Sequence, residues 1–248
     1  MKGMFSIYMC VAAILLLKTS CFESNNISYE DAVVINDIDG NKYKTIKIAD
    51  QYWMAENLSV KHYSNGDPIK NFPTDDEWKN AGNKEIGAWS YYENDSTMDM
   101  LYGKLYNWYA INDERGLCPK GWKVPSDEDW IVLEKYLGMP NNESKQLLIE
   151  RGVNENIGGK IKSKGTSHWD HPNSGATNQS GLSALPGGGR EIGGMFYYRG
   201  NLSEFWTSTD IDWISAIYRV AGFDGYGIAR GESLKHFGRS IRCIKEEK

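Results

Sequence analysis

The chain has 248 residues, of which 40% are hydrophobic and 25% are charged. This ordinary globular composition excludes a disordered or collagen-like chain, and the length allows one large domain or two small ones. With 28 basic against 33 acidic side chains the net charge is −5, which argues against a nucleic-acid-binding surface. The 26 Gly, 15 Tyr and 9 Trp favour short strands and ordered loops held by large rings.

The N-terminus has the pattern of a secretory signal peptide. Lys2 precedes an uncharged run from Gly3 to Leu17, and two small polar residues come before Cys21. A membrane-spanning helix needs roughly 20 apolar residues, which is more than this run offers. The Thr-Ser-Cys stretch resembles a bacterial lipobox, which implies that Cys21 is lipidated. Lys18 stands where a lipobox usually has an aliphatic residue, so simple secretion and an uncleaved anchor stay as alternatives.

These signals divide the chain into three parts: residues 1–20 as signal peptide, 21–32 as the lipidated cysteine with a polar tether, and 33–248 as a single domain. Removal of the first part would leave 26 basic against 33 acidic residues, a net charge of −7. We therefore expect an exported, acidic protein that is attached to a membrane through its N-terminal lipid. Its expected location is the bacterial cell envelope, as an outer-membrane lipoprotein.

A β-hairpin is predicted around the Asp-Gly pair at positions 39 and 40. Residues 33–35 before the pair and the run from Tyr43 to Trp53 after it are rich in β-formers. An Asp-Gly turn between such runs is a strong hairpin signal. The acidic residues of this turn faintly resemble a calcium loop, but the spacing and the closing Glu of an EF-hand are missing.

Two short helices are predicted next. Thr74 and Glu77 form a capping box for the first, which ends at Gly82. The second is predicted over residues 102–109, where large apolar residues recur at i, i+3, i+4 and i+7 and so share one face. That face is expected in the core, and its members are Tyr102, Leu105, Tyr106 and Tyr109.

Two further helices follow in the sequence. Ser126 caps a helix that buries Trp130 and Leu133 and ends at Gly138. A short surface helix is predicted over residues 141–152, with Gly152 as its end.

The last third of the chain has a different character. Residues 158–205 are rich in Gly, Ser and Asn, with scattered aromatic residues. Four segments then have the composition of short strands separated by turns: residues 205–209, 215–222, 226–231 and 239–245. Helices in the middle and strands mostly at the end indicate an α+β fold.

The cysteines support export. Cys10 lies in the apolar targeting run and Cys21 is the candidate lipid site, which leaves Cys118 and Cys243 for the domain. Two cysteines in an oxidising compartment favour one disulfide. Two free thiols or a metal pair are the alternatives, although neither cysteine has a flanking His at ligand spacing.

Several long motifs carry a family resemblance. The strings DIDGNKYKTIKI, QYWMAENL, YGKLYNWYAIND, GLCPKGWKVPSDEDW, SGLSALPGGGR, FWTST and GRSIRCIK occur in this order. Together they resemble the Fibrobacter succinogenes major paralogous domain, from about residue 36 to 246, with a local insertion at 141–157. The resemblance implies an exported bacterial protein, often a lipoprotein, and supplies no mechanism.

The layout also resembles the C-type-lectin-like fold and its formylglycine-generating-enzyme relatives. That likeness implies short helices, a small antiparallel sheet and long ordered Gly/Asn-rich loops. It further implies a terminal strand beside the first strand, and a long-range disulfide of the kind that Cys118 and Cys243 would form. Fold-level analogy of this kind carries no function by itself.

No catalytic residue is predicted. The chain has four histidines, and none lies in a nucleophile motif. His168, Asp170 and His171 are weak candidates for a metal site, but Pro172 and Asn173 indicate a polar loop. The alternative is a calcium ion that organises this loop through the oxygens of Asp170, Asn173 and Asn178. The segment 183–190 lacks a P-loop lysine and is interpreted as an irregular turn.

Aromatic and amide-rich loops favour recognition of a glycan without a metal. Aromatic faces pack on sugar C–H groups, while Asn and Asp bind hydroxyls. The aromatic candidates, each of which could instead be a core residue, are Trp169, Tyr197, Tyr198, Trp213 and Tyr226, and the polar ones are Asp170, Asn173 and Asn178. The sequence thus predicts a non-catalytic module that binds a glycan or a surface protein. The alternatives are an enzyme related to the formylglycine-generating group and a purely structural envelope protein.

Overall fold

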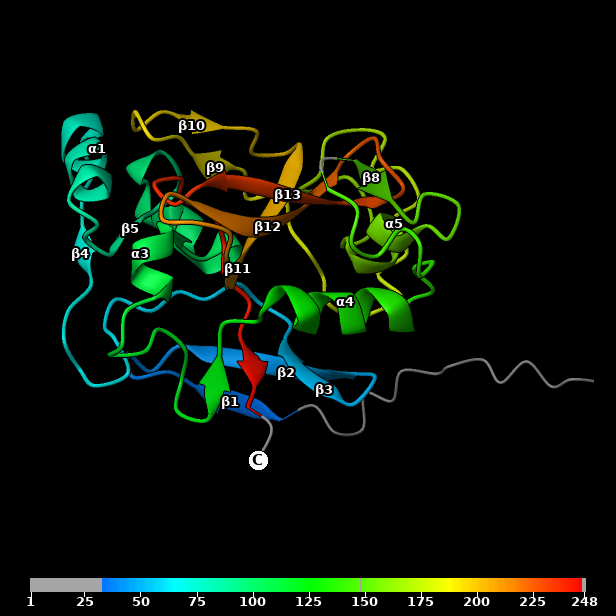
Figure 1. Ribbon diagram of the computed structural model, residues 1–248, viewed down its shortest axis with the longest axis horizontal. Helices are drawn as coiled ribbons and strands as arrows, with labels where there is room; N and C mark the ends of the chain where they lie inside the picture. Colours follow the sequence, from blue (N-terminus) through cyan, green and yellow to red (C-terminus); the bar gives the residue numbers. More distant parts are fainter. Residues whose placement is uncertain (1–32, 148, 247–248) are drawn as a thin grey trace, which may run out of the picture.

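The computed structural model describes residues 33–147 and 149–246. Four strands come first, short helices and short strands follow in the middle, and three longer strands lie near the C-terminus (Figure 1). The predicted α+β class is confirmed. None of the helices in these two ranges is long and apolar enough to cross a bilayer. The predicted signal peptide, Cys21 and the tether lie outside the described residues and stay predictions.

The helices are α1 (Asp75–Asn83), α2 (Asp99–Tyr102), α3 (Trp108–Ile111), α4 (Asp127–Tyr136) and α5 (Ile157–Ile161), with 3₁₀ turns η2 (Tyr92–Asn94) and η3 (Ser96–Met98). The strands are β1 (Val34–Asn36), β2 (Lys42–Ile48), β3 (Gln51–Met54), β4 (Lys70–Asn71), β5 (Ala88–Ser90), β6 (Leu105–Tyr106), β7 (Trp122–Lys123), β8 (Glu150–Arg151), β9 (Gly189–Arg190), β10 (Phe196–Tyr197), β11 (Leu202–Asp210), β12 (Ser215–Gly222), β13 (Ile228–Leu234) and β14 (Ile244–Lys245).

The first sheet has the order β1-β2-β3-β14-β7. The predicted hairpin joins β1 to β2 through a turn in which the Asp37 carboxylate accepts the backbone N–H groups of Asp39 and Asn41. The terminal strand β14 pairs with β3 and β7. The expectation that it would lie beside the first strand is therefore wrong, because β2 and β3 lie between them.

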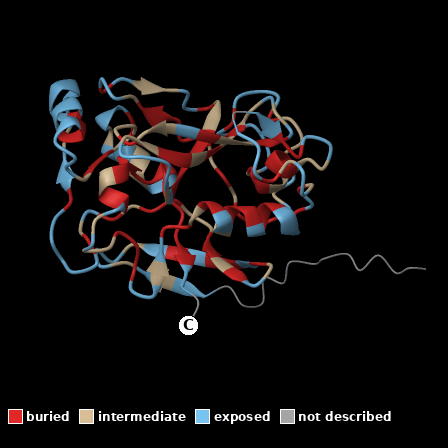
Figure 2. Ribbon diagram, in the orientation of Figure 1, coloured by how far each residue is buried: buried red, intermediate tan, exposed pale blue. Residues whose placement is uncertain are grey.

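The second large sheet is antiparallel, with the order β11-β12-β13-β8. Figure 1 shows α4 between this sheet and the first one. The Trp130 ring on α4 lies 4.9 Å from the Trp53 ring on β3 and 5.4 Å from the Phe205 ring on β11. Helix α4 therefore packs on both sheets, and its buried and exposed faces alternate accordingly in Figure 2.

The two capping boxes predict their helices correctly. On α4 the Ser126 hydroxyl accepts the Asp129 N–H, and the Asp129 carboxylate accepts the Ser126 N–H. Gly138, with φ +108°, ends that helix in a conformation that only glycine adopts easily. The Thr74 box begins α1, which extends to Asn83.

The helix predicted over residues 102–109 is wrong. Helix α2 ends at Tyr102, and Gly103 has φ +65°, which breaks the helical path. Leu105 and Tyr106 form strand β6 because they pair with β5, and Tyr106 also pairs with Arg239. Tyr102, Leu105 and Tyr106 are nevertheless buried, as the spacing indicated. Tertiary pairing has overridden the local period here.

The surface helix predicted over residues 141–152 is also wrong within the described residues. Residues 141–145 form turns, and β8 pairs with β13. Arg151 on β8 is fully buried, where both of its Nη atoms donate to the Glu134 carboxylate at 2.9 and 3.1 Å. A long-range ion pair therefore fixes this segment as a strand.

A cluster of buried ions joins α4 to the second sheet. Glu134 binds Arg219 as well as Arg151, and Asp127 lies 2.8 Å from Arg219 and 2.6 Å from Arg230. Burial by itself would raise the pKa of Asp127, but the hydrogen bond from Arg230 and the charge of Arg219 outweigh it and hold that pKa below its usual value. We call these five residues the α4 ion cluster.

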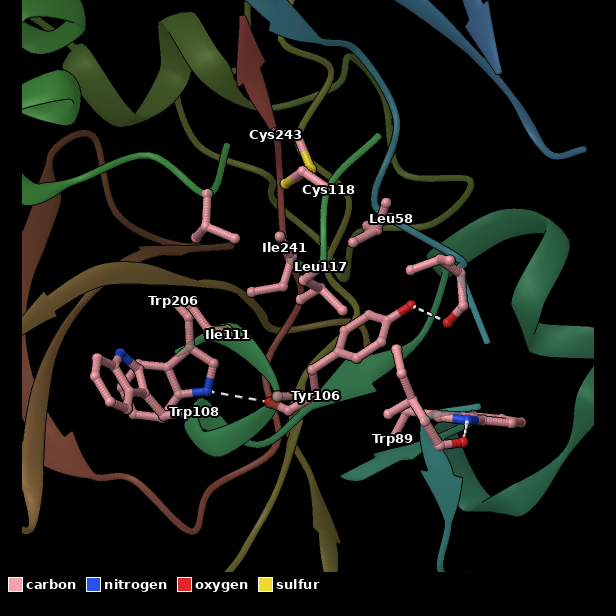
Figure 3. Packing of buried hydrophobic residues seen from close by; sticks show 14 of the residues in the cluster. Leu58, Trp89, Tyr106, Trp108, Ile111, Leu117, Cys118, Trp206, Ile241 and Cys243 are labelled. Carbon is pink, nitrogen blue, oxygen red and sulfur yellow. Dashed lines mark hydrogen bonds between the residues drawn. A yellow bond between two sulfur atoms is a disulfide. The ribbon is translucent and has the colours of Figure 1, made fainter. Parts of the chain in front are cut away.

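The predicted disulfide between Cys118 and Cys243 is present, with Cα atoms 6.0 Å apart across a sequence separation of 125 residues. Figure 3 shows it beside Leu58, Leu117 and Ile241 in the aromatic core cluster. The bond therefore ties the loop after α3 to the segment that enters β14.

Candidate binding groove

Two of the candidate ligand contacts belong to the interior, which is the alternative that the sequence left open for them. Trp169 is 2% exposed, and its indole N–H points to the Ala184 carbonyl and the Ser163 hydroxyl, each at 3.1 Å. The buried Asn173 amide donates to the carbonyls of Ser163 and Gly165. These side chains hold the loop together and offer no face to a ligand.

The exposed aromatic candidates do not form one patch. Trp213 is 79% exposed in the turn between β11 and β12, whereas Tyr226 is exposed between β12 and β13, at the opposite end of these antiparallel strands. Tyr198, 60% exposed, precedes β11 and so lies at the Tyr226 end. The eight residues of β12 separate the two ends by about 25 Å. One small ligand cannot contact all three rings.

Two further predicted binding residues, Tyr197 and Asn178, are partly engaged within the fold. The Tyr197 hydroxyl donates to Glu204, and burial raises the pKa of that phenol. The Asn178 amide donates to the Ser183 hydroxyl, while its carbonyl oxygen accepts the Ser183 N–H.

The weak metal candidates are exposed but do not converge. His168, Asp170 and His171 are all exposed, and the Asp170 carboxylate accepts the side-chain amide of Asn201 at 2.8 Å. Among the described residues, no three His, Cys, Asp or Glu side chains are placed to hold one metal ion.

Lys162, which the sequence analysis did not single out, supplies a cation inside these loops. Its Nζ donates to the carbonyls of Ser174, Gly222 and Gly225, each at 2.8 Å, and lies 5.4 Å from the Trp169 ring. Burial lowers its pKa to about 8. The ammonium thus links the Gly-rich loop to the β12–β13 turn, as a loop-organising metal ion would.

A histidine–carboxylate pair bears on the enzyme alternative. His62 Nδ1 is hydrogen-bonded to Asp39, beside a cavity of about 260 Å³ that Ser64 also lines. The Ser64 hydroxyl, however, donates to the Arg115 carbonyl. Its proton is therefore directed away from the arrangement that a nucleophilic serine needs.

Two adjoining cavities of about 410 Å³ each flank helix α2. They share Glu56, Asn57, Asp99 and Met100. One extends over β2 and the loop 178–185, and the other extends toward the start of β2. We call the two cavities together the α2 groove. Of the predicted site residues, Asn178 lies in its wall.

The ridge between the two cavities is anchored from behind. Met100 is 97% exposed, but its neighbour Asp99 accepts two hydrogen bonds from Lys104 Nζ, at 2.7 and 2.9 Å, and one from the Ser59 hydroxyl. Burial lowers the pKa of Lys104, although the hydrogen bonds to Asp99 and its charge act to raise it. The Lys104 Nζ also lies 5.2 Å from the Trp89 ring. The short helix α2 is thereby fixed while Met100 projects into solvent.

Arg242 lies in the wall of the groove and is only 1% exposed. Its Nε donates to the Asn57 side chain at 2.6 Å, and its Nη1 donates to the carbonyls of Leu182 and Met54 at 2.7 and 3.2 Å. No carboxylate among the described residues lies within 4.0 Å of it. Burial lowers its pKa to about 9, and the charge of Glu56 opposes that shift.

The lining of the groove offers several kinds of group to a ligand. It combines hydroxyl and amide side chains with the apolar Ile46 and Leu185 and with charged groups of both signs, and the described lining contains no His or Cys. A few polar groups on an apolar wall are typical of a ligand site. Sequence reasoning missed this groove because its walls come from segments near residues 44, 56, 100, 183 and 242.

The chain belongs to the Fibrobacter succinogenes major domain family, whose model matches residues 46–245. The resemblance drawn from the seven motifs is thereby confirmed. Searches among curated proteins and among solved structures found no match. The likeness to C-type-lectin-like and formylglycine-generating folds stays a prediction.

Proposed function

We propose that the chain is an exported, non-catalytic binding module of the bacterial cell envelope, which holds a glycan or a protein partner in the α2 groove. The observation that carries this proposal is the pair of adjoining cavities on either side of the Met100 ridge. The buried Arg242, which contacts no carboxylate of the described residues, lies in their wall. A site of this size and mixed polarity suits a ligand of several functional groups.

The address of the module is part of the same proposal. The signal-like residues 1–20 and Cys21 precede the domain by a short polar segment. A lipid on Cys21 would hold the domain close to an envelope membrane, with its groove free for glycans or proteins there. Cys21→Ala should abolish membrane fractionation and acyl labelling. Retained label in that variant would contradict the lipid anchor.

The binding proposal is tested with the full chain in detergent, on a glycan array and in capture of envelope proteins. Met100→Glu places a charge on the ridge between the cavities and should abolish binding without affecting folding. Met195→Glu is the matched control, because Met195 is also exposed and lies outside the groove. Equal binding by the Met100 variant and the wild type would overturn the assignment of the groove, and no binding to either class would overturn the function.

A further inference from the structure

We propose that the ligand of the α2 groove is an acidic glycan, one of whose anionic groups is bound by Arg242 with support from Lys44. This inference rests on the proposed function and narrows it to a class of ligand.

Arg242 differs from the other fully buried arginines because it has no acidic partner within residues 33–147 and 149–246. Arg151 and Arg219 contact Glu134, and Arg190 lies 3.7 Å from Asp75. Arg242 is held by neutral oxygens only. A guanidinium in this setting gains strongly from a nearby anion, because the surroundings screen charge weakly. An anionic ligand is the partner that the described residues do not supply.

The donors of Arg242 indicate where such a group would bind. Nε and Nη1 are occupied by hydrogen bonds of 2.6 and 2.7 Å, whereas the single contact of Nη2 is the Ser183 carbonyl at 3.4 Å. Nη2 is therefore the least engaged donor. Ser183 also lines the groove, which places this donor at the cavity wall.

The groove is locally positive on an acidic protein. Lys104 neutralises Asp99 from behind the ridge. The remaining charged lining residues are three cations, Lys42, Lys44 and Arg242, and one anion, Glu56. With Asp99 neutralised, the groove therefore carries a net charge of about +2. The whole chain has a net charge of −5. Such a local excess attracts and orients an anion.

The wall of the groove favours a glycan over a peptide. Peptides in extended grooves commonly add a strand to a free sheet edge. At the groove, Lys44 and Thr45 of β2 are bonded on both sides. Lys44 pairs with Val34 and its carbonyl accepts the Ala55 N–H, while Thr45 pairs with Met54 and its N–H donates to the Val33 carbonyl. A peptide therefore finds no free strand edge at these two residues. The wall instead offers side chains that suit sugar hydroxyls. Ser163 accepts the Trp169 N–H and keeps its own proton to donate, and Asn178 keeps a second amide proton.

The proposal is tested by calorimetric titration of the full chain in detergent with oligogalacturonate and with its methyl ester. The two probes share their sugar hydroxyls and differ in charge. We expect the acidic probe to bind at least about tenfold more tightly than the ester, as befits one charge-assisted hydrogen bond. Equal affinity for both probes would overturn the acidic preference while leaving a glycan-binding function standing.

Variants assign the charge to named residues. Arg242→Gln should reduce the preference for the acidic probe about tenfold, and Lys44→Gln should reduce it by a smaller factor. Lys47→Gln is the matched control on the same strand, because Lys47 does not line the groove. Loss of the buried Arg242 side chain risks misfolding. Lys44→Gln and the esterified probe therefore test the preference for an anionic ligand in a protein that keeps Arg242. An unchanged preference in both variants would overturn the site.

A third probe separates the class of ligand. A poly-glutamate peptide carries comparable charge without sugar hydroxyls, so we expect it to bind more weakly than oligogalacturonate. Binding of the peptide but not of the glycan would overturn this inference and leave the protein-partner form of the proposed function. No binding of any of the three probes, together with a blank glycan array, would overturn both.

Discussion

Buried cations are handled in two different ways in this molecule. In the α4 ion cluster, Arg151 and Arg219 share the carboxylate of Glu134, itself fully buried. Around the Gly-rich loops, the equally buried Lys162 and Arg242 are held mainly by backbone carbonyls. In the first arrangement each cation contacts a carboxylate. In the second, no carboxylate of the described residues lies within 4.0 Å of either cation.

This difference separates a structural device from a site with unused capacity. A guanidinium that already has its carboxylate contributes to the fold and has little left to offer a ligand. A cation held by carbonyl oxygens keeps its net charge, and its effect depends on what lies beside it. Lys162 lies beside loop backbone and organises it, whereas Arg242 lies beside a cavity. Single substitutions can remove one member of this comparison at a time.

The largest effect is expected from the disulfide, which constrains the carbonyl-held side of the comparison. Cys243 is adjacent to Arg242 in the chain, so the bond to Cys118 fixes the segment that carries the guanidinium. For this separation of 125 residues, the chain-entropy model gives about 4–5 kcal/mol of stability. Replacing both cysteines with Ala should lower the free energy of unfolding in urea by about that amount. A loss below about 1 kcal/mol would contradict it.

The acidic side of the comparison is broken by Glu134→Ala. This substitution leaves Arg151 and Arg219 buried without their shared carboxylate, so we expect a loss of about 3–5 kcal/mol in the free energy of unfolding. Glu128→Ala on the same helix is the control. Glu128 pairs with Lys145 in solvent, and its loss should cost less than about 1 kcal/mol. Similar losses for the two variants in urea titrations would show that the α4 ion cluster stabilises the fold no more than a surface ion pair does.

The carbonyl-held side is tested by Lys162→Met. The variant keeps the aliphatic length and removes the donor to three carbonyls, while it also removes a desolvated charge. These effects oppose each other, so the expected net loss is smaller, about 1–3 kcal/mol. Hydrogen exchange of residues 174–176 and 222–226 should rise more than exchange in α4. A uniform rise across the domain would argue against a local role in organising the loops.

Local chemistry made part of this architecture predictable. The capping boxes at Thr74 and Ser126 and the Asp-Gly hairpin turn each depend on side chains within a few residues, and each prediction is confirmed. The helix over residues 102–109 failed because Gly103 and the pairing of Tyr106 with Arg239 decide that segment. Arg239 lies more than a hundred residues from Tyr106 in the sequence.

The site was less accessible to sequence reasoning than the fold. Arg242 lies in a motif that predicted a strand, and nothing nearby in sequence reveals that its partners are Asn57 and Leu182. Exposed rings such as Trp213 were identified by composition, which cannot indicate that they lie at opposite ends of one sheet. Of the predicted residues, Asn178 lies in the wall of the groove.

The smallest expected effect concerns pH and again separates Lys162 from an ordinary lysine. Its pKa in the folded protein is about 8, below the usual value of 10.5, because burial disfavours the charged form. Between these two values the folded state releases its proton first, so the unfolded state binds more protons. Stability contributed through this group therefore rises with pH from about 8 upward.

The measurement is the difference in free energy of unfolding between the wild type and Lys162→Met, at pH 8.0 and 9.5. We expect this difference to shift in favour of the wild type by about 1–2 kcal/mol over that interval. Buried tyrosines with raised pKa values, such as Tyr106, act in the opposite direction near pH 10, but they are common to both proteins and cancel. Lys145→Met, at an exposed lysine, should give a flat difference. A flat difference for Lys162→Met as well would mean that the three carbonyl contacts hold the ammonium at an ordinary proton affinity, and the contrast with the α4 ion cluster would then lie in geometry alone.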